Sequence, residues 1–270
     1  MTNPAWQDIL LPPDNEDNVW ELFHENSKIG RHTRALSNDE VRRRMQEFYE
    51  SLPFEGYPIV ELPATTLRLE RTLTEAITSR VSVRQFRPRS LTLLEAATLL
   101  HHAYGITRDN QGTSFPRPFR VAPSGGALYP LEIFLHSSQI EGLQPGLYHY
   151  NPTRNHLRLL GEGDATGVIA QKLVQPEVAR DASLVVFLTA VFERSVFKYG
   201  DRGYRFIFLE AGHVAQNLNL VSNALGLGCL NIGGYFDREV DDFLGLDGLT
   251  HSTVYLIAIG KPAKELGNPS

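Results

Sequence analysis

The sequence predicts a domain of mixed α and β structure, because capped helical segments occur together with strand segments of two kinds. Short runs at 131–136, 147–150 and 156–160 are typical of strands that follow one another as a meander, with an Asn-Pro-Thr-Arg-Asn turn between the last two. Continuous apolar runs at 184–191 and 254–259 are typical of strands that are covered on both faces. These two runs should therefore lie inside the sheet.

The N-terminal region differs from the rest, and we predict an accessory arm over residues 1–65 and a single domain over residues 66–270. In the arm, Ser37 and Glu40 form a capping box at the start of one helix. The apolar positions at helical spacing after this box are Val41, Met45, Phe48 and Leu52. A contribution of the arm to docking a bulky substrate is our expectation for its role.

A short helix directly before residue 80 and three further helices are expected in the main domain. Thr92 and Glu95 form a capping box before a helix over 93–104. The longest helix should run over 204–225, where apolar residues recur on one face and a glycine follows. A shorter helix should follow Asp237, which is a suitable N-cap residue.

Composition excludes several classes of function. The net charge of -5 and the pI of about 6.0 argue against binding to nucleic acid, which requires a basic face. The single cysteine, Cys229, excludes an internal disulfide framework and a Cys-rich metal site, and we expect no metal. No apolar run reaches the length of a membrane span and no signal segment is evident, so we expect a cytoplasmic protein without membrane contact.

Three polar stretches have the residue types that hold a phosphorylated, flat cofactor. In the first, RVSVRQF, the alternating Arg80, Ser82 and Arg84 would share one face of an extended chain. Guanidinium groups bind phosphate through paired, charge-assisted hydrogen bonds, and a serine hydroxyl adds another polar contact. The same pattern also occurs on solvent-facing strand edges, and this alternative stays open.

The other two stretches contain glycine pairs. In APSGGALYPLEIF (122–134), Gly125 and Gly126 allow the backbone to approach a ligand closely, although a tight turn before the strand would need them as well. LGCLNIGGYF (227–236) places a second glycine pair directly after a short strand. Lys261, at the end of the last strand, is either a second cation for a phosphate or a solvated lysine.

In this order, the three stretches resemble the motifs of the nitroreductase superfamily of flavin enzymes over about residues 66–263. The strings PSGGALYPLE, FKYGDRGYRF and FHENSKIGRH resemble more narrowly the SagB-type dehydrogenases, the branch that contains the azoline (thiazoline) oxidases. The resemblance implies FMN as cofactor and an α+β fold with a central mostly antiparallel sheet flanked by helices. It also implies an intertwined homodimer with two FMN sites at the subunit interface.

The resemblance also assigns cofactor-binding residues. Arg80, Ser82, Arg84 and Lys261 would hold the phosphate and the ribityl chain of FMN. The residues that would border the flavin or approach its ring are Pro123, Ser124, Gly126, Tyr129, Gly233 and Gly234.

Lys198 and Tyr199 match the Lys-Tyr pair of the azoline oxidases, whereas composition alone would make them the end of a strand and a charged turn. Aromatising an azoline removes a hydride, which goes to flavin N5, and a proton, which needs a base. A lysine is a base at neutral pH only when its pKa lies below the usual value of about 10.4, and Arg202 and Arg205 are candidate cationic neighbours. The sequence leaves the two roles open, and Gly200 and the glycine at 203 are expected to form a hinge beside the pair.

The expected function is therefore FMN-dependent oxidation of thiazoline or oxazoline rings in a peptide natural product, with dioxygen reoxidising the flavin. The substrate is either a ribosomal peptide or an intermediate bound to a carrier protein. The corresponding partner is a cyclodehydratase or a nonribosomal peptide synthetase. Two alternatives are an NAD(P)H-dependent nitroreductase or quinone reductase, and a catalytically silent scaffold subunit of a biosynthetic complex.

Overall fold

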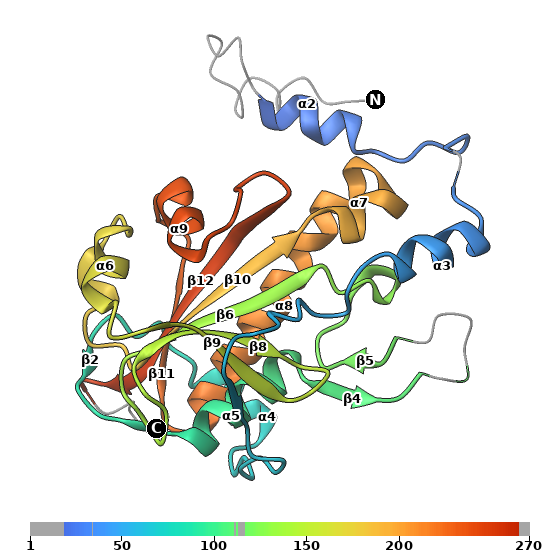
Figure 1. The fold of residues 1–270 in the computed structure, drawn as a ribbon. Coiled ribbons are helices and arrows are strands. Elements are labelled where there is room, and N and C mark those ends of the chain that lie inside the picture. Colours follow the sequence, from blue (N-terminus) through green and yellow to red (C-terminus); the bar gives the residue numbers. More distant parts are fainter. Residues whose placement is uncertain (1–18, 34, 111, 113–116, 265–270) are drawn as a thin grey trace, which may run out of the picture.

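The computed structural model of the protein describes residues 19–33, 35–110, 112 and 117–264. At its centre lies an eight-stranded sheet (Figure 1). Its strands are β1 (Ile59–Glu61), β2 (Phe86–Arg87), β6 (Leu131–Ser137), β8 (Gly146–Asn151), β9 (His156–Glu162), β10 (Leu184–Val191), β11 (Gly228–Ile232) and β12 (His251–Pro262). They follow the order β1-β9-β8-β6-β10-β12-β11, and β2 pairs with the end of β12. Every pairing in this sheet is antiparallel, so the predicted α+β fold is confirmed.

Two short pairs of strands lie outside the main sheet. They are β3 (Leu91–Thr92) with β7 (Ile140–Glu141), and β4 (Ile106–Arg108) with β5 (Phe119–Arg120). The α-helices are α2 (Val19–Asn26), α3 (Asn38–Gln46), α4 (Leu73–Thr78), α5 (Leu93–Tyr104), α6 (Thr166–Gln171), α7 (Glu193–Tyr199), α8 (Asp201–Ala224) and α9 (Asp237–Leu244). Short 3-10 turns lie at η2 (Gly125–Ala127) and η3 (Pro176–Val178).

The apolar runs form the inner strands, as predicted. β10 spans the whole run at 184–191 and lies between β6 and β12. Val186 and Leu188 enter the core that α5 and α8 cover, whereas Val185 and Phe187 enter the core on the opposite face, beside α6 and α9. Alternate side chains of one strand are thus buried on both faces, which explains why the run is continuously apolar.

Local capping signals predicted one helix well and another only in part. α5 begins at the Thr92–Glu95 capping box and covers 93–104. At α3 the Ser37 side chain accepts a hydrogen bond from the Glu40 amide, but the helix ends at Gln46. The expected continuation to Phe48 and Leu52 is wrong. The chain turns away there because the buried Arg117 guanidinium binds the carbonyl oxygens of Met45 and Phe48, which a longer helix would use internally.

The segment before the long helix also differs from the prediction. Lys198 and Tyr199 lie in the last turn of a separate helix, α7, and α8 begins at Asp201 instead of residue 204. Gly200 separates the two helices with a φ of +54°. Gly203 lies within α8 at its contact with α7, where a Cβ atom would stand 2.9 Å from the Ser195 backbone, and a hinge at Gly200 and Gly203 stays a prediction. At α9 the N-cap is Phe236, and Asp237 lies in the first turn, where its charge complements the helix dipole.

Candidate active site

The Lys198–Tyr199 pair meets the loop of residues 124–127, which we name the SGG turn. Gly126 in this turn has a φ of +66°, a conformation that favours glycine. A Cβ atom on Gly126 would stand 2.6 Å from Tyr199 Oη and 2.8 Å from Lys198 Nζ. Only a glycine leaves room for both side chains, so the fold brings together two of the predicted stretches.

Aromatic packing holds the pair in this position. The Tyr199 and Phe206 rings pack edge to face with centroids 4.9 Å apart, and Phe206 lies directly behind Gly125. Lys198 Nζ lies 5.2 Å from the centroid of the Tyr199 ring. Arg205, a candidate neighbour of Lys198, points elsewhere, because its guanidinium donates to Ser27 Oγ and to the His24 carbonyl on the α2 side. The expectation that Arg205 acts on Lys198 is therefore wrong.

Residues 80–84, which we name the Arg80 strand, run along β11. Ser82 forms a parallel bridge with Cys229, and the Val83 amide donates to the Cys229 carbonyl at 3.0 Å. Val83 is buried, Ser82 and Arg84 are exposed, and Arg80 is half-buried. Val81 is exposed as well, so burial does not alternate along the segment, and a shared face of Arg80, Ser82 and Arg84 stays a prediction. At the far end of β11, Gly233 and Gly234 are exposed, and nothing lies within 4 Å of where a Cβ atom would stand on Gly233.

Lys261 lines a cleft to which the Arg80 strand does not contribute. Its Nζ lies 3.6 Å from a Glu95 carboxylate oxygen, and it lines a cleft of about 320 Å³ together with three arginines. The residues that line this cleft are Arg71, Arg87, Arg89, Leu225, Gly226, Lys261 and Pro262. Arg80, Ser82 and Arg84 are not among them, so a joint contact of Lys261 and the Arg80 strand with one phosphate stays a prediction.

A buried carboxyl group lies behind the SGG turn. Glu210 on α8 accepts a hydrogen bond from Tyr104 Oη at 2.6 Å and also interacts with the Ser124 hydroxyl. Ser124 Oγ accepts the Tyr129 amide at 2.9 Å, and the buried Tyr129 side chain points away from the surface toward Arg120. Burial raises the pKa of Glu210 to about 7. The turn is thus backed by a group that gains or loses a proton near neutral pH.

This pKa shift predicts a pH-dependent contribution to stability. In the unfolded chain Glu210 loses its proton near pH 4.5, but in the folded chain only near 7, so it stabilises the fold most below pH 4.5. The contribution should fall by about 3 kcal/mol between these two pH values and stay constant above. Urea unfolding of wild type and Glu210→Gln from pH 4 to 8 measures it as the difference between the two curves. If the free energies of unfolding of the two proteins differ by the same amount at every pH, the prediction is wrong.

The arm contributes to the wall of this site. Val41 and Met45 of α3 pack against Leu128, Phe197 and Tyr199. Arg117 binds α3 to the turn, because its guanidinium donates to the carbonyls of Met45 at 2.5 Å and Leu128 at 3.2 Å. Arg120 in turn donates to the Glu50 carbonyl. A pair of arginines from β4–β5 therefore fixes the arm beside Tyr199, which the sequence analysis did not foresee.

No cluster of three or more His, Cys, Asp or Glu side chains able to hold a metal ion occurs among the described residues. Within the same ranges, no helix has the length and apolar character that crossing a bilayer requires. The sequence analysis missed two buried glutamates, Glu132 and Glu210. Each interrupts an otherwise apolar strand or helix face, which is a signal that a sequence can carry.

The central antiparallel sheet flanked by helices is a nitroreductase-like fold. The model of the nitroreductase family matches residues 77–261, and the chain belongs to this family.

Three relatives in the family are informative. MJ1384, a nitroreductase-like protein of Methanocaldococcus jannaschii, is 37% identical over 64% of this chain and 83% of its own length. The microcin B17-processing protein McbC of Escherichia coli is 35% identical over 51% of each chain. The trifolitoxin-processing protein TfxB of Rhizobium leguminosarum bv. trifolii is 29% identical over 62% of this chain and 46% of its own. The chain thus matches about half the length of the two processing proteins.

Solved structures share the fold. A nitroreductase-like protein of Anabaena variabilis has a TM-score of 0.72 at 24% identity, with 94% of this chain and 49% of that chain covered. A chain of the Escherichia coli microcin synthetase McbBCD complex, with truncated pro-MccB17 bound, has a TM-score of 0.57 at 24% identity and coverages of 91% and 92%. A Desulfovibrio desulfuricans nitroreductase-like protein in complex with FMN has a TM-score of 0.51 at 19% identity and coverages of 74% and 91%.

Proposed function

We propose that this chain is an FMN-dependent oxidase that aromatises thiazoline or oxazoline rings in the biosynthesis of a peptide natural product. The observation that carries the proposal is the contact of Lys198 and Tyr199 with Gly126 in the SGG turn. Similarity to two peptide-processing proteins, McbC and TfxB, supports the class of substrate. A cyclodehydratase or a nonribosomal peptide synthetase would supply the azoline, and dioxygen would reoxidise the flavin.

The residues present fit FMN. The Arg80 strand presents Arg84 and Ser82 to solvent beside Arg80, a donor set that suits a phosphate and a ribityl chain. Gly233 and Gly126 are exposed glycines where backbone can approach a flat ring. FMN bound there supplies the acceptor for the hydride of the azoline ring.

The Lys-Tyr pair would handle the proton. The ring of Tyr199 is held by Phe206 and by the α3 residues Val41 and Met45, which suits it to orient the substrate ring by a hydrogen bond. Lys198 has a long flexible side chain that ends at the same point, which suits it to accept the proton from the azoline carbon. The two groups thus divide orientation and proton transfer between them.

An anaerobic stopped-flow experiment tests this function. A thiazoline-containing peptide should bleach the flavin absorbance within the turnover time, and mass spectrometry should find a product lighter by two hydrogens per ring. Rapid bleaching by NAD(P)H but not by the azoline would instead favour a reductase, a function to which the similarity with MJ1384 points. A colourless protein that FMN cannot reconstitute would favour the scaffold subunit.

The two halves of the site lie far apart within one chain, which supports a homodimer. Phe206 at one end of α8 contacts the SGG turn, and Asn223 at the other end binds Ser79 beside the Arg80 strand. Seventeen helical steps from Phe206 to Asn223 separate these ends by about 25 Å, longer than one FMN molecule. A two-fold axis that sets two α8 helices antiparallel would bring opposite ends together. The exposed Phe208 (42%) and Leu209 (59%) on α8 suit such an interface.

Subunit complementation tests this dimer. We expect Arg80→Ser/Arg84→Ser and Lys198→Ala each to be inactive alone. After co-refolding, half of the dimers are mixed, and each mixed dimer carries one unaltered site if the site combines both subunits. About a quarter of the wild-type activity should then return. A mixture as inactive as its components would place the two halves in the same subunit and contradict the shared site.

A further inference from the structure

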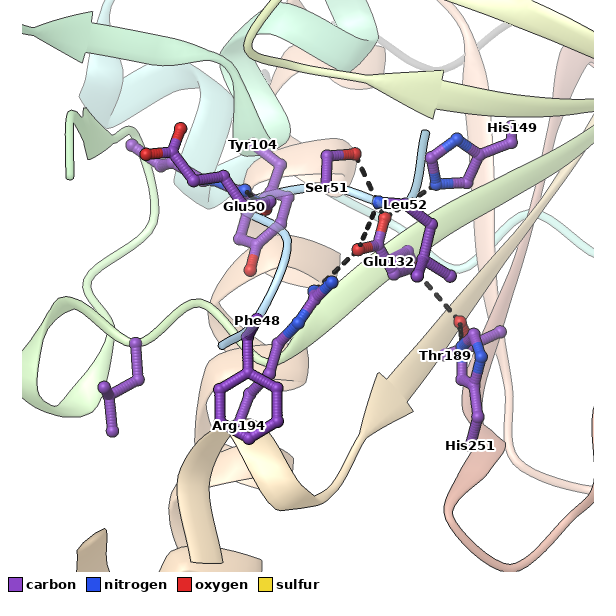
Figure 2. Close-up of polar contacts among 12 residues, drawn as sticks. Phe48, Glu50, Ser51, Leu52, Tyr104, Glu132, His149, Thr189, Arg194 and His251 are labelled. Carbon is purple, nitrogen blue, oxygen red and sulfur yellow. Dashed lines mark hydrogen bonds and ion pairs between the residues drawn. The ribbon is translucent and has the colours of Figure 1, made fainter. Parts of the chain in front are cut away.

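Glu132 lies at a buried junction of four segments of the chain (Figure 2). It is on β6 in the middle of the sheet and is 2% exposed. Its carboxylate forms an ion pair with Arg194 Nη1 at 2.6 Å and lies 2.6 Å from His149 Nε2. It also accepts hydrogen bonds from the Leu52 amide at 3.0 Å and from Ser51 Oγ at 3.2 Å.

The charge on Glu132 is stabilised by these partners. Burial opposes its ionisation, but Arg194 and then His149 hold the pKa of the carboxyl well below its ordinary value. Desolvation offsets much of the attraction in such a pair, so stability alone gives weak reason for its presence. Positioning of the segments that the pair joins is a stronger reason for its presence.

Arg194 connects Glu132 to the proposed catalytic pair. It lies in the first turn of α7, is 2% exposed, and is followed one turn later by Lys198 on the same face. Only Arg194 and Ser195 are buried on this seven-residue helix. A helix of seven residues has little intrinsic stability. It is held by the packing of Phe197 and Tyr199 against α3 and Leu128, and the ion pair of Arg194 with Glu132 ties it to β6.

The same carboxylate also holds the arm. Ser51 and Leu52 follow α3, whose Val41 and Met45 pack against Tyr199. One carboxylate thus joins α7, through Arg194, and the chain that follows α3, through Ser51 and Leu52. α3 packs against Tyr199, and Tyr199 reaches Gly126.

We propose that Glu132 is a positioning residue that sets α7 and the arm around the SGG turn and thereby places Lys198 and Tyr199. The inference rests on the proposed function of that pair. Rigid placement matters because a misplacement of about 1 Å costs about 100-fold in rate.

A double-variant cycle separates positioning from stability. Glu132→Gln and Arg194→Gln each leave one buried charge without its partner and should lower the urea midpoint strongly. The double variant replaces the ion pair by two neutral amides and should recover most of the midpoint. Its rate of azoline oxidation should nevertheless stay about 10- to 100-fold below wild type with KM within about threefold. A double variant with both the midpoint and the rate of wild type would overturn the proposal.

Matched controls complete the test. Asp241 is another buried carboxylate. It accepts hydrogen bonds from Ser252 Oγ and from the Thr253 amide, each at 2.7 Å, and these partners belong to β12 and not to α7 or the arm. Asp241→Asn should lower the midpoint and keep the wild-type rate per folded molecule. If the double variant does not fold, Arg194→Lys, which keeps the charge but loses the planar guanidinium, should lower the rate about tenfold. An unchanged rate in that variant would equally refute the inference.

Hydrogen exchange makes the result independent of the substrate. Mass spectrometry should find the amides of residues 195–199 exchanging about tenfold faster in the double variant, with those of β10 unchanged. If wild type does not oxidise azolines, the proposed function fails, and the exchange of α7 still decides whether Glu132 anchors this helix. Unchanged exchange of α7 would refute the anchor even where the rate falls.

Discussion

Lys198→Ala should lower the rate of azoline oxidation by about 10²–10⁴-fold, the usual contribution of a positioned general base. Its ammonium or amine group ends 2.8 Å from the place of a Cβ atom on Gly126, at the proposed edge of the flavin. Tyr199→Phe should cost less, about tenfold, because the ring contact with Phe206 remains and only the hydroxyl is lost. Both variants should keep FMN, because neither residue lies at the Arg80 strand.

Single-turnover reduction of the flavin by a thiazoline peptide measures the effect, and the flavin-to-protein ratio measures retention of the cofactor. Tyr57→Phe is the matched control for Tyr199→Phe, because the Tyr57 side chain is exposed and its ring packs against Phe54. If both site variants react at the wild-type rate, the mechanism is wrong. If they lose FMN as well, the pair has a binding role instead.

The sheet was predictable because its signals are local. A central strand such as β10 must be apolar on both faces, and α5 carries a complete capping box, so short windows of sequence contain the information. The family resemblance then indicated which glycines and cations to expect in a site. The structure adds that the SGG turn and the Arg80 strand lie at opposite ends of α8, which no local pattern states.

α7 and the path of the arm were not predictable for a physical reason. The buried side chains of α7 are Arg194 and Ser195, so the helix lacks the apolar period by which a helix is usually detected. The end of α3 depends on Arg117, and the position of Ser51 depends on Glu132, partners far away in the sequence. Polar contacts between distant segments depend on the fold and leave only weak traces, such as a glutamate within an apolar strand.

Gly126→Ala should reduce the oxidation rate about 100-fold while costing only about 1 kcal/mol of stability. The added methyl group would stand 2.6 Å from Tyr199 Oη and 2.8 Å from Lys198 Nζ, closer than any relaxed contact. Both atoms are ends of side chains, so they can move aside at little cost to the fold. A shift of about 1 Å is nevertheless enough to misalign a proton acceptor with its substrate.

Gly142→Ala provides the matched control for Gly126→Ala. Gly142 has a φ of +80°, and nothing lies within 4 Å of where its Cβ atom would stand. Both variants therefore incur the same kind of backbone strain, but only the change at Gly126 displaces the Lys-Tyr pair. Urea midpoints should fall alike in the two, and the rate of flavin reduction per bound FMN should fall only in Gly126→Ala. Equal rates in the two variants would show that the contact at Gly126 is not required for the reaction. The proposed role of placing Lys198 and Tyr199 against the turn would then be refuted.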